Sequence, residues 1–236
     1  MKTAVILFAY QRPRYLKKCL ASFKKAYEPK LAFHYYAFVD YSWLQDKIAR
    51  MIRESGIFDM VYKRKRKMGL NDNITQGIYE KFQTYDAIIV IEDDIVLEPS
   101  ALSYLIEMLE KHKNDKSIGQ VNLSGNFQSS HGWATWKDRW QKVCFNNFPL
   151  EGDLAKEYLK HKSWDTVYSH NFNLQGWEAI GEKLATHIGN IGTHYNILSR
   201  FSIRKQFRKW KNDYYRDKNL LMEKESLIHN FYRLFI

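Results

Sequence analysis

The sequence predicts an α/β protein in which a mostly parallel sheet is covered by helices on both faces. In the first half of the chain, short apolar runs alternate with segments that have the apolar spacing of amphipathic helices. The runs are apolar almost throughout, as strands are when helices cover both faces of a sheet. Apolar residues make up 45% of the 236 residues, which is enough to bury a sizeable core.

The expected elements follow one another in a regular order. The first run ends shortly before Pro13, which suits the first turn of a helix. Strands are expected at Thr3–Ala9, Ala32–Val39, Phe58–Tyr62 and Ala87–Ile91, and in the stretch SIGQVNLSGNF that begins at Ser117. Helices are expected at Arg14–Ala26, Leu44–Ser55, Asn73–Phe82, Pro99–Lys111 and Leu174–Leu184. After Ser117 the alternation weakens, so the second half is less closely defined.

The C-terminal part has a different character from the rest of the chain. We expect a main domain at 1–199 and a basic, amphipathic helical extension at 200–236, where cationic and aromatic residues alternate. On a helix this pattern suits the interface of a membrane with anionic headgroups. A helix packed on the domain with a solvated basic face explains the same pattern, and the apolar stripe near the end suits either the core or a homodimer contact.

Composition narrows the class of protein. The formal net charge is +11, and a basic surface attracts nucleic acid, anionic lipid or phosphorylated substrates. The two cysteines have no metal-like spacing, which argues against a disulfide scaffold or a zinc finger. The N-terminal segment lacks the features of a signal peptide. We therefore expect a cytoplasmic protein, free or at the inner face of the cytoplasmic membrane.

Carboxylates follow two of the expected strands at the point where each strand ends. Asp40 follows the second strand, and Glu92, Asp93 and Asp94 follow the fourth. Ligands of open α/β sheets bind beyond the carboxyl ends of the strands. Hard cations such as Mg²⁺ and Mn²⁺ prefer carboxylate oxygen and share their site with substrate phosphate. A solvated loop with a helix N-cap explains the same acids, and the local sequence leaves both interpretations open.

Six segments resemble, in matching order, glycosyltransferases with the GT-A fold. They are AVILFAYQRPRYLKKCLASF, AFVDYS, IVIEDDIVLEPSAL, HGWATWKDRW, SWDTVY and HIGNIGTHYN, from about residue 3 to 196. The resemblance is to family 2 glycosyltransferases and to the bacterial relatives of N-acetylglucosaminyltransferase I. It implies a Rossmann-like GT-A domain with a nucleotide-sugar half at about 1–125 and an acceptor half at about 126–199.

The resemblance also assigns residues to the donor site. Ala9, Tyr10, Arg12, Asp40 and Asn73 would line the nucleotide pocket, with Arg12 on phosphate and Asp40 on the base. Glu92 and Asp93 would contact ribose or the water around a metal ion. Asp94 would be the direct metal ligand, and His194 would complete the metal shell. Each has a simpler explanation as a cap, a turn residue or a solvated side chain.

The same resemblance assigns the acceptor side. Asp165 would be the general base, with Glu151 and Asp153 as rivals and a helix cap as the simpler explanation. His131 would face the acceptor sugar, and Trp133 and Trp136 would form a wall on which a sugar ring stacks. For the two tryptophans, packing in the core explains the same residues.

These assignments predict a metal-dependent, inverting enzyme that uses Mn²⁺ or Mg²⁺. It would move a hexosyl or N-acetylhexosaminyl group from a nucleotide-diphosphate sugar, with UDP favoured, to a glycan or lipid-linked acceptor in bacterial surface polysaccharide or lipopolysaccharide assembly. A nucleic-acid-binding protein and a non-catalytic glycosyltransferase-like module are the alternatives. A sugar nucleotidyltransferase fits less well, because AYQRPRYL has no glycine after the first strand.

Overall fold

The computed structural model describes residues 1–27, 34–143 and 164–189. These residues belong to one compact unit, Met1–Gly189. The predicted boundary at residue 199 and the extension at 200–236 lie outside them and stay predictions. No helix in the described ranges combines the length and apolar character needed to cross a membrane.

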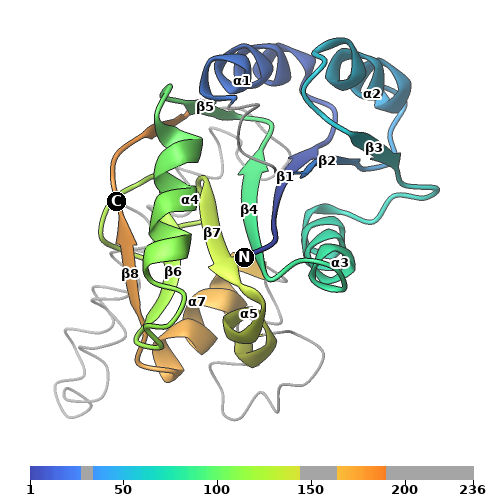
Figure 1. The fold of residues 1–236 in the computed structure, drawn as a ribbon. Helices are drawn as coiled ribbons and strands as arrows, with labels where there is room; N and C mark the ends of the chain where they lie inside the picture. Colours follow the sequence, from blue (N-terminus) through green and yellow to red (C-terminus); the bar gives the residue numbers. More distant parts are fainter. Residues whose placement is uncertain (28–33, 144–163, 190–236) are drawn as a thin grey trace, which may run out of the picture. The chain divides into compact units, whose positions relative to one another are not determined.

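Within these ranges the main sheet has seven strands in the order β3-β2-β1-β4-β7-β6-β8 (Figure 1). Their bounds are β1 Thr3–Ala9, β2 His34–Val39, β3 Met60–Lys63, β4 Ala87–Glu92, β6 Ile118–Asn122, β7 Trp133–Trp136 and β8 Glu178–Gly181. β7 is antiparallel to both of its neighbours, and the other neighbouring strands are parallel. A separate two-stranded ladder pairs β5 (Ile95–Leu97) with β9 (Ala185–His187). The predicted mostly parallel sheet is confirmed.

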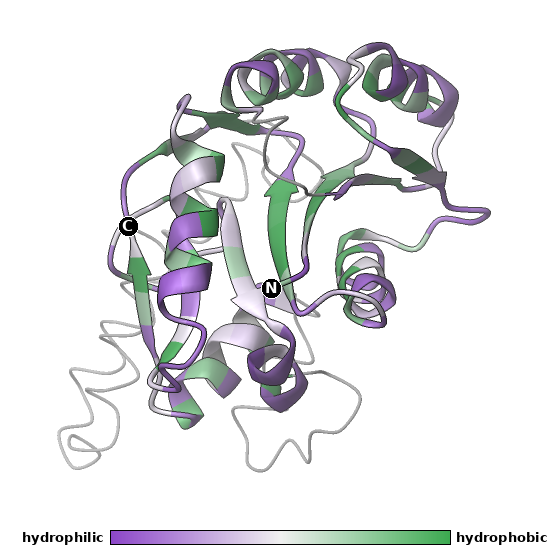
Figure 2. Ribbon diagram, viewed as in Figure 1, coloured by the Kyte–Doolittle hydropathy of each residue, from purple (hydrophilic) through white to green (hydrophobic). Residues whose placement is uncertain are grey.

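Helices cover both faces of this sheet. The described helices are α1 Pro13–Ala26, α2 Gln45–Glu54, α3 Leu70–Phe82, α4 Ala101–Lys111, α5 Lys137–Val143 and α7 Trp164–Leu174. Figure 1 shows α1, α2 and α4 apart from α3, α5 and α7. Figure 2 shows β4, between the two groups, as a continuously hydrophobic strand, as expected for a strand buried on both faces.

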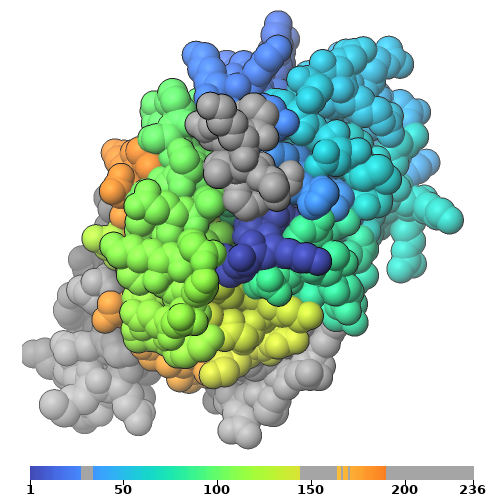
Figure 3. Space-filling model, viewed as in Figure 1, coloured from blue at the N-terminus to red at the C-terminus, as the bar shows by residue number. Residues whose placement is uncertain are grey.

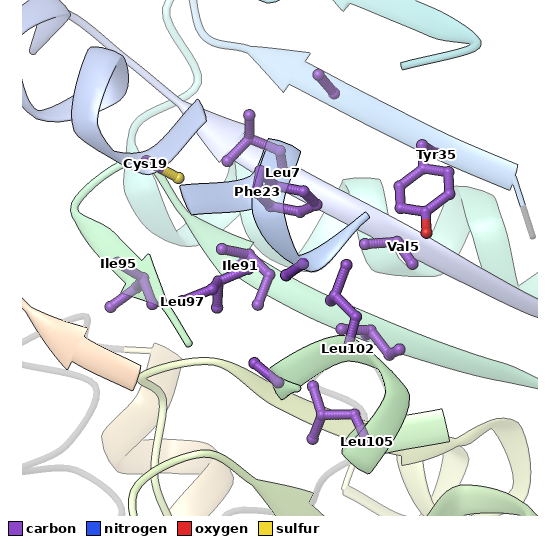
Figure 4. Packing of buried hydrophobic residues seen from close by; sticks show 14 of the residues in the cluster. Val5, Leu7, Cys19, Phe23, Tyr35, Ile91, Ile95, Leu97, Leu102 and Leu105 are labelled. Atoms are coloured by element: carbon purple, nitrogen blue, oxygen red, sulfur yellow. The ribbon is translucent and has the colours of Figure 1, made fainter. Parts of the chain in front are cut away.

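The alternation of side chains along β1 separates the two cores. Val5 and Leu7 belong to a cluster with α1, α2 and α4, part of which is shown in Figure 4. Ile6 and Phe8 belong to a second cluster with α3, α5 and α7. Successive side chains of a strand point to opposite faces, so one apolar run supplies both layers.

α3 lies very close to the sheet because of one glycine. A Cβ atom added at Gly77 would lie 2.6 Å from Cε1 of Phe8 and 3.1 Å from Cδ2 of Phe38. A side chain at this position would therefore push α3 away from β1 and β2.

One predicted element is wrong. The spacing of apolar residues predicts a helix over Leu174–Leu184, but α7 ends at Leu174 and Glu178–Gly181 forms strand β8. Gly176, with a φ of 64°, follows the end of α7 and turns the chain. β8 then pairs with the free edge of β6. Tertiary pairing outweighs helical propensity over such a short segment.

Candidate active site

The acidic triplet lies at the switch point of the sheet. β4 ends at Glu92, and Asp93 and Asp94 form the turn that leads into β5. Its neighbour β1 ends at Ala9, and the strand order runs from β1 toward β3 on one side and from β4 toward β8 on the other. Open α/β sheets bind ligands where the order diverges in this way. Asp93 is 1% exposed and Asp94 4% exposed, so both carboxylates need partners.

Arg12 is the cation that holds Asp93 and Asp94. Its Nη1 atom donates to Oδ2 of Asp94 at 2.5 Å, and its Nη2 atom donates to Oδ1 of Asp93. The backbone N–H of Tyr10 donates to the other oxygen of Asp93 at 3.0 Å. The turn after β1, which was predicted to reach the nucleotide, therefore binds the acidic turn after β4. Arg12 remains partly exposed, and its contact with a donor phosphate stays a prediction.

The three acids differ in how firmly they are ionised. Burial, and then the charges of Asp94, Asp93 and Asp165, raise the pKa of Glu92 to about 8 against the opposing charge of Arg12. Burial raises the pKa of Asp93 to about 6, although Arg12 and the Tyr10 N–H oppose this. Burial also raises the pKa of Asp94, but the hydrogen bond with His187 and the charge of Arg12 outweigh it, so this pKa is lowered. Asp94 is therefore the most firmly ionised of the triplet.

His187 is the histidine that the structure brings to Asp94. Its Nε2 atom lies 3.2 Å from Oδ2 of Asp94. It is the last residue of β9 and pairs with Ile95, the residue after Asp94. The backbone N–H of Ile188 also donates to the carbonyl oxygen of Asp94 at 2.9 Å. The predicted ligand His194 lies outside the described residues.

The imidazole ring of His131 packs on that of His187. The rings of His131 and His187 stack with their centroids 4.4 Å apart and an angle of 5° between their planes. Burial and the neighbouring His187 lower the pKa of His131, although the charges of Asp94 and Asp165 oppose this. The charges that act on His131 place it near Asp94 and Asp165, and its predicted contact with an acceptor sugar stays a prediction.

Gly189 packs tightly against the pair of Asp94 and His187. A Cβ atom at this position would lie 2.1 Å from Oδ2 of Asp94 and 2.8 Å from Nε2 of His187. Both distances are shorter than van der Waals contact, so only a glycine lets these two atoms keep their positions. The sequence contained this signal in HIGNIGTH, where glycine follows His187 by two positions.

The oxygen of Asp94 and the nitrogen of His187 are suited to bind a divalent cation. The described ranges hold no group of three or more His, Cys, Asp or Glu side chains arranged as a ready-made metal cage. Two bonds of about 2.1 Å at a right angle would place their donor atoms about 3.0 Å apart. The 3.2 Å between Oδ2 of Asp94 and Nε2 of His187 is close to this separation. Mg²⁺ and similar ions commonly take one or two protein ligands and complete their shell with water and phosphate.

Asp165 faces the same acids from the other layer of the molecule. It lies in the first turn of α7 and is half-buried. Its charge raises the pKa of Glu92 and of His131, which places it near both residues. Its role as general base stays a prediction, and its rivals Glu151 and Asp153 lie outside the described residues.

Asp40 and Asn73 form hydrogen bonds that hold together the loops around the predicted nucleotide pocket. Asp40 accepts hydrogen bonds from the backbone N–H groups of Tyr41, Met68 and Gly69 at 2.8 to 2.9 Å. Its own N–H donates to the carbonyl oxygen of Ala9 at 3.1 Å. These bonds join the chain segments that follow β1, β2 and β3.

The side chain of Asn73 accepts a bond from Nε of Arg64 at 2.9 Å and is 4% exposed. Its bond, like those of Asp40, is structural. Contact of Ala9, Asp40 and Asn73 with a nucleotide stays a prediction.

The prediction that Trp133 and Trp136 form a stacking wall for a sugar ring is wrong. Trp133 is 0% exposed and Trp136 is 2% exposed, so neither ring can stack on a sugar. Trp133 packs on Trp164 and Tyr168, with ring centroids 5.7 and 5.2 Å away. Trp136 lies in the opposite core cluster and donates from Nε1 to the carbonyl oxygen of Leu109 at 3.1 Å. Because successive residues of β7 point to opposite faces, the odd spacing of these residues sends one ring into each core.

The sheet order, the two helical layers and the acids at the switch point define the class, a GT-A glycosyltransferase. The model of the family "Glycosyl transferase family 2" matches residues 4–234. The chain belongs to this family, and the predicted class of enzyme is confirmed at that level. No curated protein matches the sequence.

Solved structures share the fold at low sequence identity. The mannosyltransferase PcManGT from Pyrobaculum calidifontis, in complex with GDP-Man and Mn²⁺, matches with a TM-score of 0.56 and 11% identity over 76% of this chain and 54% of its own. TarS 1–349 from S. aureus, in complex with UDP, matches with a TM-score of 0.54 and 12% identity over 78% of this chain and 58% of its own.

Glucosyl-3-phosphoglycerate synthase from Mycobacterium tuberculosis, in complex with Mn²⁺, UDP and glucosyl-3-phosphoglycerate, matches with a TM-score of 0.56 and 11% identity over 85% of this chain and 75% of its own. The chain thus spans little more than half the length of PcManGT and of TarS 1–349. At these identities the likeness shows the fold.

Proposed function

We propose that the protein transfers a sugar from a nucleotide-diphosphate sugar, with a UDP-sugar favoured, to a glycan or lipid-linked acceptor, with the help of Mn²⁺ or Mg²⁺. The observation that carries this proposal is the position of Asp94 between Arg12 and His187 at the switch point of the sheet. The complexes of PcManGT with GDP-Man and Mn²⁺ and of glucosyl-3-phosphoglycerate synthase with UDP and Mn²⁺ support it.

Asp94 and His187 would hold the cation through Oδ2 and Nε2, whose positions depend on the absence of a side chain at Gly189. When bound, a divalent cation stabilises the negative charge of the leaving diphosphate. Arg12 keeps Asp94 and Asp93 ionised and in place, since two carboxylates this deeply buried repel each other without a cation. The remaining N–H groups of its guanidinium could donate to phosphate.

Asp165 would act as the base. It would take the proton of the acceptor hydroxyl while that oxygen forms a bond to the anomeric carbon. The bond from the anomeric carbon to the diphosphate breaks in the same displacement, and its electrons leave with the diphosphate. A single displacement of this kind inverts the anomeric configuration. The half-burial of Asp165 and its nearness to Glu92 and His131 support this role.

A binding experiment tests the donor site. Thermal stability would be measured with UDP-, GDP-, CMP- and dTDP-sugars, each with and without Mn²⁺ or Mg²⁺. We expect stabilisation that requires both nucleotide and cation, and we expect Asp94→Asn to abolish it. Asp138→Asn is the matched control, because Asp138 is an exposed carboxylate that pairs with Lys116 and Arg139. A wild-type protein that responds to none of these ligands would contradict the proposal.

The role of Asp165 is tested separately. The Asp165→Asn variant should bind donor and cation as the wild type does and transfer sugar roughly 100-fold to 10,000-fold more slowly, the usual contribution of a general base. Transfer at the wild-type rate would remove Asp165 from the mechanism.

We propose a bacterial surface polysaccharide or lipopolysaccharide as the setting, and a peripheral membrane contact through 200–236. A shift of protein from the membrane pellet to the supernatant on truncation after residue 199 is the expected result.

A further inference from the structure

Two neighbouring loops carry exposed residues that the proposed reaction does not use. One loop follows β2 and carries Tyr41 and Trp43; the other follows β3 and leads into α3 at Leu70. We call Tyr41, Trp43, Lys65, Arg66, Lys67 and Leu70 the cationic–aromatic patch. Figure 1 shows the loop between β3 and α3 standing away from the body of the domain, and Figure 2 shows it as strongly hydrophilic.

The two loops are tied to each other. The two carboxylate oxygens of Asp40, in the first loop, accept the N–H groups of Met68 and Gly69, in the second. Nε2 of Gln45 donates to the carbonyl oxygen of Arg64 at 2.9 Å, and Lys63 pairs with Asp46. These bonds hold together the two loops that carry the apolar and the cationic residues.

The cations of the patch have no ion pair within the part of the chain that the structure describes. Lys65, Arg66 and Lys67 are exposed, and none has an ion pair among the described residues. The flanking cations are different, since Lys63 pairs with Asp46 and Arg64 with Glu80. The exposed carboxylates nearby include Asp46, which pairs with Lys63, and Asp72, in the first turn of α3. The three unpaired cations leave the loop with an excess of positive charge, and Figure 3 shows teal side chains of this region at the edge of the molecule.

The apolar members are unusually exposed. Trp43 is 86% exposed, Tyr41 is 51% exposed and Leu70 is 42% exposed. Single exposed apolar residues are common on protein surfaces. Here three of them share two joined loops with three cations that have no ion pair among the described residues.

We propose that the cationic–aromatic patch docks on an anionic lipid surface. Trp and Tyr rings favour the headgroup region of a bilayer, and Lys and Arg side chains are attracted by anionic headgroups. A nucleic acid would also suit the cations and the aromatic rings. The exposed Leu70 favours lipid, because a leucine side chain gains free energy at the boundary of the acyl chains and cannot stack on bases as an aromatic ring does.

This surface is distinct from the predicted membrane contact at 200–236. It lies at the carboxyl ends of β2 and β3, at the same edge of the sheet as the acidic triplet. Docking through it would bring that edge close to the lipid headgroups.

Sedimentation of the full-length protein with vesicles tests the proposal. The vesicles would contain either equal parts of phosphatidylglycerol and phosphatidylcholine or phosphatidylcholine alone. We expect binding to the anionic vesicles that weakens as salt is added. The combined variant Lys65→Gln, Arg66→Gln and Lys67→Gln should bind on the order of 100-fold more weakly, since each cation near such a surface contributes roughly a factor of five.

Matched variants on the opposite edge of the sheet control for net charge and for hydrophobicity. Lys111→Gln, Lys116→Gln and Lys142→Gln remove three exposed charges there and should leave binding unchanged. Trp43→Ser should weaken binding roughly tenfold, the factor for burying about 60 Å² of apolar surface. Leu174→Ser, at a residue that is 68% exposed, should have no effect.

Three results would overturn the proposal. The first is equal loss of binding in the patch variant and in its charge control. The second is equal binding to anionic and neutral vesicles. The third is a wild-type protein that ignores both vesicles but binds single-stranded DNA through Lys65, Arg66 and Lys67, which would assign the patch to a nucleic acid. None of these readouts depends on sugar transfer, so the outcome is independent of the proposed function.

Discussion

The Nε2 atom of His187 lies 3.2 Å from the Oδ2 atom of Asp94, across 93 positions of sequence. The pairing of β5 with β9 produces this contact, because it sets His187 opposite Ile95. An oxygen and a nitrogen donor therefore meet at the end of a two-stranded ladder, outside the main sheet. Under the proposed function, this relationship would give the acidic motif a second protein ligand for a cation.

His187→Ala should lower the affinity for Mn²⁺ by at least roughly tenfold, because one of two protein donors is lost. Isothermal titration calorimetry with Mn²⁺ in the presence of UDP measures this. His131→Ala is the matched control, since it removes the stacked ring and leaves both donor atoms. Unchanged Mn²⁺ affinity in His187→Ala would mean that His187 only orients Asp94.

Gly189→Ala should impair binding of cation and donor more than it impairs stability. The new Cβ atom would meet Oδ2 of Asp94 at 2.1 Å, and Arg12 restrains that carboxylate from moving aside. Donor-dependent thermal shifts and the melting temperature of the free protein separate the two effects. Thr186→Ala, at an exposed position in the preceding strand β9, should change neither. A Gly189→Ala protein with full metal-dependent binding would show that the close approach of residue 189 to Asp94 does not matter for the site.

Arg12→Met should destabilise the protein by about 3 to 5 kcal/mol at neutral pH, because Asp93 and Asp94 would lose their cation inside the protein. Urea unfolding measures the change. Arg14→Met, at an exposed position in α1, the helix that follows Arg12, should cost less than about 0.5 kcal/mol. Added Mn²⁺ should restore part of the stability of Arg12→Met, since it neutralises the same carboxylates. A variant as stable as the wild type would show that Arg12 is not their essential partner.

Trp133→Ala should destabilise the fold by about 3 to 5 kcal/mol through the cavity it leaves among Trp140, Trp164 and Tyr168. The fraction that remains folded should show an unchanged KM for the acceptor. A stable variant with a raised acceptor KM would support contact with a sugar and contradict the buried position of the ring.

The sequence was most informative where structure is local. The apolar runs that form β1 and β4 and the helical spacing of α1, α2 and α4 can be read within windows of about ten residues. The acids at the end of β4 follow from the same reading, because the strand ends where the charge begins. A glycine-free turn such as AYQRPRYL, in contrast, does not reveal that Arg12 binds carboxylates some 80 positions away.

The features that were missed depend on pairing between distant segments. His187 acquires its role only when β9 aligns with β5, and β8 becomes a strand only because β6 offers an edge. The tryptophans of β7 were misassigned for a related reason. A sequence rich in aromatic residues suits a sugar site and a core equally well, and burial decides between them.

The pairing of β5 with β9 also determines the order in which the parts of the site can form while the chain is synthesised. β1, α1 and β4 leave the ribosome early, so Arg12 can already hold Asp93 and Asp94 while the second half of the chain is still being made. His187 and Gly189 emerge roughly 90 residues later, a delay of about 5 to 18 seconds at common elongation rates. Under the proposed function, the nascent chain would pass through a stage in which the acidic turn is formed but lacks its second ligand, and the arrival of β9 would complete the cation site.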